Sequence, residues 1–196
     1  MKAYCFVPEE RIEEITECGM ELSVGERYAC KVTSNDGRCF VGRLNPRDFD
    51  KADFLPGKKL VKINLAKVRS FIGEGVYLDI DSETGSGMFE DSLLPSKEYQ
   101  LGMYRKPVCL IVNTVLPEAV EKYDSLMDEA VPYVNSEELY IEYLFNNEAE
   151  KNENFREVAL AACFDKLAEN NMVEKKTYGD YILYNSEDTS YIVRKG

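Results

Sequence analysis

The chain has 196 residues, of which 36 are acidic, 24 are basic and none is histidine, so its formal net charge is −12. The absence of histidine excludes serine or cysteine nucleophiles activated by imidazole, together with the usual zinc sites. The surplus of carboxylates repels phosphate backbones, which argues against general nucleic-acid binding and favours a basic protein surface as the partner.

The composition is that of a folded globular protein, with 44% apolar and 31% charged residues. No signal-peptide core precedes Pro8, and no apolar run reaches the roughly 18 residues that span a bilayer. No two cysteines have the C-x-x-C spacing, which favours reduced and largely buried thiols. We therefore expect a soluble, cytoplasmic protein that does not associate with membranes. The cysteines are Cys5, Cys18, Cys30, Cys39, Cys109 and Cys163.

The chain opens with a strand and a helix. Residues 3–7 alternate in the manner of a strand, and Pro8 is well placed as the first residue of a helix that ends at Gly19. Two further strands, 28–33 and 38–44, flank a Ser-Asn-Asp-Gly turn. This arrangement predicts a hairpin.

The middle of the chain contains the most apolar segment. Residues 60–65 and 76–80 have the patterns of strands. The segment 81–95 is rich in Ser, Gly and acidic residues, and this composition predicts a long surface loop. Residues 108–115 are almost continuously apolar. We expect them to form the central strand of the sheet, buried on both faces.

The last part of the chain is predicted to be mainly helical before a closing hairpin. Pro117 begins a helix to about residue 127, and Asn135 or Ser136 caps another to about Phe145. A helix from Phe155 to about residue 169 and two strands, 181–184 and 190–193, complete the chain.

These elements predict an α+β fold with a mixed, mainly antiparallel sheet and flanking helices. The main domain is expected to span 1–145, and the polar stretch 146–154 is the predicted linker. Residues 155–196 form a C-terminal helix-hairpin appendage, which we expect to pack on the main domain. A separate winged-helix module is the alternative for this appendage, although its acidic balance does not suit DNA.

Four acidic residues have the spacing of a calcium-binding loop. Asp79, Asp81, Glu83 and Glu90 occupy the first, third, fifth and twelfth places of a twelve-residue segment. The sixth place, where a sharp turn needs glycine, is Thr84. A solvated acidic loop without a metal is the favoured interpretation, and metal binding is the alternative.

The segment that enters the central strand is the best candidate binding site. This segment contains five polar, charged or aromatic residues, Glu98, Tyr99, Tyr104, Arg105 and Lys106. Tyrosine offers a flat face and a hydroxyl, and arginine offers a planar fork for carboxylate or phosphate. A loop whose tyrosines merely cover the edge of the core is the alternative. The nearby Cys109 is expected to be a core residue, because burial in an apolar strand raises a thiol pKa.

Two short stretches resemble the ADP-ribosyltransferase fold, particularly its DNA-modifying toxin branch. They are the strand-helix opening from Tyr4 to Met20, with the pattern I-x-x-I-x-x-x-G, and the segment from Arg105 to Glu118, which closes on V-x-P-E. Such transferases place a polar residue, often histidine, on the first strand and a catalytic glutamate at the start of the late strand. The resemblance puts Cys5 and Val108 at these positions.

The resemblance therefore implies a copy of the fold without the standard catalytic residues, in which Glu98 or Glu90 would have to replace the missing carboxylate. Two functions stay open. The first is a non-catalytic binding or regulatory protein, such as an inhibitor, immunity or defence-related factor, whose acidic surface docks on a basic partner. The second is an NAD-dependent ADP-ribosyltransferase or related nucleotide-handling enzyme that binds its cofactor through Tyr99, Tyr104 and Arg105. The charge and the lack of histidine favour the first.

Overall fold

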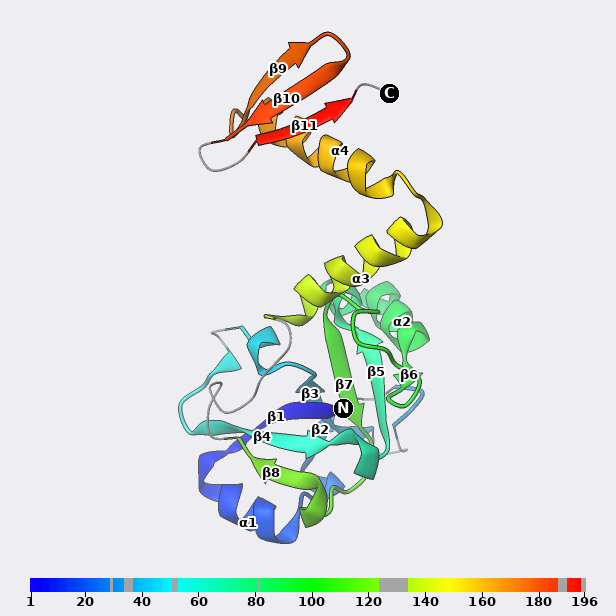
Figure 1. The fold of residues 1–196 in the computed structure, drawn as a ribbon. Coiled ribbons are helices and arrows are strands. Elements are labelled where there is room, and N and C mark those ends of the chain that lie inside the picture. The colour runs from blue at the N-terminus through cyan, green and yellow to red at the C-terminus, as the bar shows by residue number, and fades with distance from the viewer. Residues whose placement is uncertain are drawn as a thin grey trace. The chain divides into compact units, whose positions relative to one another are not determined.

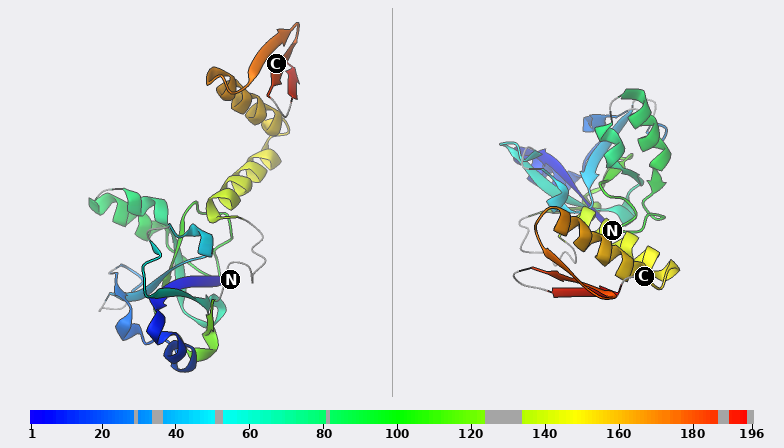
Figure 2. Two further views of the ribbon diagram at one scale, coloured as in Figure 1. Left: turned by 90° about the vertical axis from the view of Figure 1, so that its left-hand side faces the viewer. Right: turned by 90° about the horizontal axis from the view of Figure 1, so that it is seen from above.

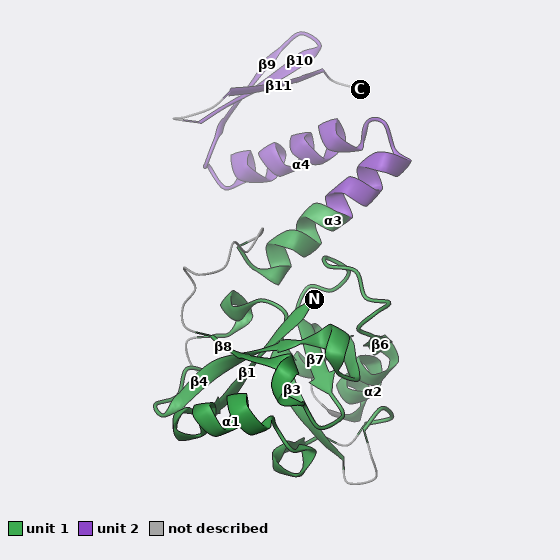
Figure 3. Cartoon of the chain, turned by 60° about the horizontal axis from the view of Figure 1, so that its bottom comes forward, with its two compact units in different colours: residues 1–143 green, residues 144–196 purple. Residues whose placement is uncertain are grey.

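The computed structural model describes residues 1–28, 30–33, 37–50, 53–80, 82–123, 134–186 and 190–194. The chain divides into two compact units, residues 1–143 and residues 144–196 (Figure 3). The boundary falls within helix α3, Ser136–Lys151, so the stretch that we predicted as a linker, 146–154, is helical up to Lys151. Glu, Ala and Lys are strong helix formers, and here they continue the helix although they have little apolar surface to bury.

The protein is an α+β protein, and its first unit is built on one sheet with the strand order β6-β5-β7-β3-β1-β4-β8 and with β2 beside β3 (Figure 1). All of its strand pairs in the described residues are antiparallel. The strands are β1 (Lys2–Pro8), β2 (Glu26–Arg27), β3 (Arg38–Arg43), β4 (Lys58–Asn64), β5 (Ser70–Glu74), β6 (Leu94–Pro95), β7 (Pro107–Ile111) and β8 (Val120–Lys122). The helices are α1 (Ile12–Cys18), α2 (Ser82–Ser92) and the start of α3, with 3-10 turns η1 (Glu9–Arg11), η2 (Leu22–Val24), η3 (Pro46–Asp48), η5 (Leu65–Lys67), η6 (Gly75–Asp79) and η7 (Pro117–Ala119).

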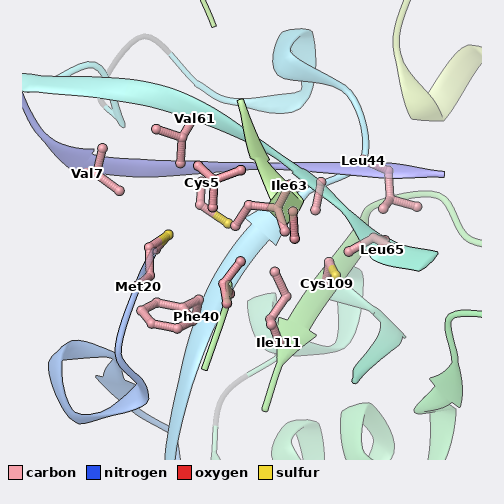
Figure 4. Close-up of a cluster of buried hydrophobic side chains, with 14 of the residues drawn as sticks. Cys5, Val7, Met20, Phe40, Leu44, Val61, Ile63, Leu65, Cys109 and Ile111 are labelled. Carbon is pink, nitrogen blue, oxygen red and sulfur yellow. The ribbon is translucent and has the colours of Figure 1, made fainter. Parts of the chain in front are cut away.

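The sheet consists of two halves that join at a single residue pair. In the described residues β1 pairs with β3 only at Tyr4 and Arg43, whereas β1 pairs with β4 along its whole length. In Figure 1, β1, β4 and β8 run across β3, β7 and β5. The larger buried cluster lies in the angle between the halves, with Val61 from β4, Phe40 from β3 and Ile111 from β7 (Figure 4).

A second buried cluster lies on the other face of β3 and β7. Consecutive residues of a strand point to opposite faces, so Cys109 joins the larger cluster while Leu110 joins the second. Helix α1 buries Ile15 in the larger cluster, and helix α2 buries Phe89 in the second. The two helices lie well apart in the views of Figure 2. Every residue of β7 is buried, which confirms the central strand predicted from its apolar sequence.

Three predicted elements of the first unit are wrong. The strand opposite β3 is Glu26–Arg27 rather than 28–33. Residues 76–80 fall in η6 and its end, and the strand beside β7 lies earlier, at Ser70–Glu74. The predicted loop at 81–95 contains helix α2, because its apolar residues bury themselves against the sheet despite the Ser and Gly content. Tertiary packing here overrides local propensity.

A fourth correction concerns the helix predicted from Pro117. The structure has only one 3-10 turn there, followed by strand β8, and residues 124–127 of that prediction lie outside the described residues. Strand β8 pairs with β4, and Ala119 and Val120 are buried in the larger core cluster, so tertiary packing overrides the local helix signal. The cap predicted for α3 is confirmed, because the side chain of Asn135 accepts a hydrogen bond from the Glu138 amide at 2.8 Å.

The second unit contains the end of α3, helix α4 (Phe155–Glu169) and an antiparallel sheet of β9 (Glu174–Tyr178), β10 (Tyr181–Asn185) and β11 (Ser190–Arg194). The helix and the closing hairpin were predicted, whereas β9 was not, because its residues are all exposed and lack an apolar alternation. Tyr184 is the centre of the small core, stacked on Phe164 and near Tyr191. Its hydroxyl donates to Asp165, which also accepts from Lys175.

The junction between the two halves of the sheet depends on a glycine. A Cβ at Gly42 would lie 2.7 Å from Cys5 Sγ and 2.8 Å from the Tyr4 backbone oxygen. We predict that Gly42→Ala lowers the free energy of unfolding by about 2 kcal/mol, because that backbone atom cannot move aside. Gly87→Ala is the matched control: its Cβ would meet nothing within 4 Å on helix α2, so this variant should gain about 0.5–1 kcal/mol. Chemical denaturation measures both, and equal effects would contradict a tight junction.

Candidate functional site

The loop that precedes β7 places only part of the predicted binding cluster at the surface. Tyr99 is buried in the larger core cluster, and its ring lies 5.3 Å from that of Tyr104. The Tyr104 hydroxyl donates to the backbone oxygen of Ser92, and burial raises its pKa. Arg105 and Lys106 are exposed. The tyrosines therefore support the loop, and the two cations are what it presents to solvent.

A buried carboxylate holds this loop in place. Glu74, at the end of β5, is 8% exposed and accepts hydrogen bonds from three backbone amides. The donors are Arg105 at 2.6 Å, Lys106 at 2.9 Å and Val76 at 3.2 Å. These hydrogen bonds fix the backbone from which the side chains of Arg105 and Lys106 extend. No pattern in the sequence marks Glu74, because its partners are main-chain groups and two of them, at Arg105 and Lys106, lie far along the chain.

Arg105 and Lys106 line a cavity of about 180 Å³ together with acidic side chains. Arg105 pairs with Glu137 and Lys106 pairs with Asp79 at 2.8 Å. Asp48 accepts from both the amide and the hydroxyl of Ser136, and burial raises its pKa. The cavity is a nearly balanced ionic network that fixes the start of α3. The other lining residues are Arg43, Arg47, Asp50 and Asn135.

The candidate catalytic carboxylates do not enter this cavity. Glu98 is exposed on the turn after β6, and Glu90 lies on α2, where its side chain accepts from the Lys31 amide at 3.4 Å. Arg105 and Lys106 therefore line the cavity together, whereas Glu98 and Glu90 lie outside it. The side chain of Arg105 pairs with Glu137, which sequence reasoning missed.

The two positions marked by the resemblance lie on opposite faces of the sheet. Arg43 pairs with both Tyr4 and Val108, so these three share one face, whereas Cys5 belongs to the cluster on the other face. Cys5 lines a cavity of about 250 Å³ between β1, β3 and α1 whose walls are mainly apolar. Val108 is 3% exposed. Side chains at Cys5 and Val108 therefore cannot form one site.

Buried thiols fill the core instead of acting as nucleophiles. Cys5, Cys39 and Cys109 are buried. Desolvation is the main cause that raises the pKa of Cys5 and of Cys39 to about 12, and it raises the pKa of Cys109 as well. A thiol with such a pKa stays protonated at neutral pH and is a poor nucleophile. Cys18 and Cys163 are exposed.

The acidic segment considered for calcium is not a loop. Asp79 lies in η6, where its salt bridge and hydrogen bond with Lys106 lower its pKa, while Glu83 and Glu90 lie on helix α2. Asp81 lies outside the described residues. Among the residues that the structure does describe, no three histidine, cysteine or carboxylate side chains gather closely enough to bind a metal ion. The helix separates oxygen ligands that a calcium loop would wrap around one ion.

A row of carboxylates covers the exposed side of η1 and α1. Glu10, Glu13, Glu14 and Glu17 are exposed and follow the i, i+3, i+4, i+7 spacing of one helical face. Ile15 points the other way, into the core. We call these four glutamates the acidic face. It was not singled out in the sequence, although its spacing was visible there.

Ion pairs neutralise only half of the acidic face. Arg11 pairs with Glu14 at 3.0 Å, and Lys122 of β8 approaches Glu13 at 4.0 Å. Within the described part of the chain, neither Glu10 nor Glu17 has a salt bridge. The helix therefore presents net negative charge to any partner.

Comparison of the chain with protein-family models, curated proteins and solved structures finds no match. Among the described helices, none combines the length and the hydropathy of a membrane span. Function must therefore be inferred from the site residues themselves.

The role of Glu74 can be tested by removing its charge. Glu74→Gln replaces one acceptor oxygen by an amide group that faces backbone N–H donors. We predict a loss of about 2–4 kcal/mol in the free energy of unfolding, measured by chemical denaturation, because buried donors lose their partners. Glu98→Gln, an exposed control, should change stability by less than about 0.5 kcal/mol. A Glu74→Gln variant as stable as the control would show that these hydrogen bonds do not hold the loop.

Proposed function

We propose that this protein is a binding or regulatory protein, of the inhibitor, immunity or defence-related kind, whose acidic face docks on a basic surface of a partner protein. The observation that carries the proposal is the alignment of Glu10, Glu13, Glu14 and Glu17 on one exposed helical face. Opposite charges across an interface accelerate encounter and select the partner. The net charge of −12 acts in the same direction over the whole molecule.

Folding alone does not require the negative charge of Glu17. Like charges three and four residues apart destabilise a helix by about 0.2–0.5 kcal/mol per pair. Glu17 lies in the last turn of α1, which contains no basic residue, and a negative charge there opposes the helix dipole. Glu10, Glu13 and Glu14 lie in first turns, where a negative charge is favourable, so only the charge of Glu17 costs stability without serving the core, as is typical of a binding surface.

Catalysis receives less support than binding. The NAD-dependent ADP-ribosyltransferase alternative needs a carboxylate beside the nucleotide, yet Cys5 and Val108 are buried among apolar side chains and Glu98 and Glu90 do not line the cavity with Arg105. This arrangement favours a protein that binds without turnover. Fold resemblance by itself does not assign an activity.

If the acidic face is the binding site, the position of a removed charge should affect the binding affinity more than the total charge of the protein does. Glu10→Gln with Glu17→Gln removes two negative charges from the acidic face, while Glu83→Gln with Glu98→Gln removes two from elsewhere. We expect the first double variant to bind a synthetic oligolysine peptide about tenfold more weakly by titration calorimetry, because it loses roughly 0.7 kcal/mol per charge. The control should bind like the parent protein. The melting temperature of the first variant should change little, because the favourable first-turn charge of Glu10 and the unfavourable last-turn charge of Glu17 are removed together.

The affinity of the parent protein for this peptide should also fall steadily between about 50 and 500 mM salt. Equal weakening of both double variants, or binding that ignores salt, would contradict docking through the acidic face. Millimolar NAD should leave the melting temperature unchanged, whereas a clear rise would support the enzyme alternative.

A further inference from the structure

A groove at the edge of the sheet is lined by three cations and, among the described residues, by no carboxylate. It has a volume of about 450 Å³ and lies where β5 begins and β6 ends. The cations are Lys67 of η5, Arg69 and Lys97, all exposed. We call this the cationic groove. Its remaining walls are Ala66, Val68, Ser70, Phe71, Pro95 and Ser96.

The three cations have no carboxylate partner in the described part of the chain, although acidic residues outnumber basic ones by 36 to 24. Lys67 donates to the backbone oxygen of Glu118 at 2.7 Å. Arg69 lies over the ring of Phe71, 5.7 Å from its centre. Elsewhere lysines and arginines commonly pair with carboxylates, as Lys62 does with Glu121. Among the described residues, positive charge has therefore accumulated here without a neutralising carboxylate.

The groove is also held rigidly. The Arg69 amide donates to Asn113 Oδ1 at 2.6 Å, and the Arg69 oxygen accepts from the Val112 amide at 3.0 Å. Two other lining residues, Ser70 and Ser96, form a hydrogen bond of 2.8 Å between their hydroxyls, and both are at least nine-tenths buried. In such a pair one hydroxyl donates to the other, so the second O–H can still donate to a ligand.

We propose that the cationic groove binds the phosphate group of a small molecule, a function separate from the docking of the acidic face. A phosphate monoester carries close to two negative charges and three acceptor oxygens, which match several cations and a hydroxyl donor. A groove of this volume falls within the range of about 300–1,000 Å³ found for small-molecule sites. A polynucleotide would extend beyond the groove and meet the negative surface of the remaining protein.

The test titrates the full chain with inorganic phosphate, at ionic strength held constant with chloride, and follows binding by calorimetry. Arg69→Gln with Lys97→Gln removes one arginine and one lysine from the groove. Arg47→Gln with Lys106→Gln removes the same two residue types from the balanced cavity beside α3. All four side chains are exposed, so both double variants are expected to fold.

We expect saturable phosphate binding that weakens about tenfold or more in the groove variant and less than about twofold in the control. Equal weakening in both variants, loss in the control alone, or no saturable binding by the parent protein would overturn the proposal. Binding of a single-stranded oligonucleotide without binding of inorganic phosphate would overturn it too. The variant that lacks Glu10 and Glu17 charges should bind phosphate normally, so failure of this proposal is separable from failure of the docking proposal.

Discussion

The single residue pair between β1 and β3 determines how the first unit is built. Because Tyr4 and Arg43 alone join these strands in the described residues, the two halves of the sheet can turn across one another and enclose the main core in the angle. Gly42 allows the close approach that the junction needs. Helix α1 then has one side to bury, through Ile15, and its other side is free to carry charge.

Charge is distributed unevenly over this scaffold, and that distribution is the basis of the functional account. Carboxylates cluster on the exposed side of α1, whereas cations that have no carboxylate partner among the described residues gather in the cationic groove at the β5–β6 edge. The cavity beside Arg105 differs from both surfaces, because it is lined by positive and negative side chains, and its Arg105–Glu137 pair anchors α3. A molecule that concentrates charges of one sign on its surfaces, and keeps the thiols of Cys5, Cys39 and Cys109 protonated in the core, is suited to recognition rather than to covalent chemistry.

Sequence patterns predicted the elements that depend on local signals and missed those that depend on distant partners. The apolar run at β7 and the cap at Asn135 were recognised because each is encoded within a few residues. Helix α2 was missed because its Ser and Gly content suggests a loop, yet Gly85 packs against the backbone of η6 and Phe89 fills the second core cluster. Of the site, Arg105 was predicted, but the hydrogen bonds of Glu74 join segments about thirty residues apart and leave no trace in sequence spacing.

The central claim is that recognition of a basic partner occurs on the acidic face. Amide chemical-shift mapping of the isotope-labelled protein during titration with an oligolysine peptide tests it most directly, because each backbone amide reports its own surroundings. We predict that the largest shifts fall within residues 9–21, around η1 and α1. Shifts centred instead on the acidic stretch of α3 and α4, at 148–157, or spread evenly over all exposed carboxylates, would contradict it.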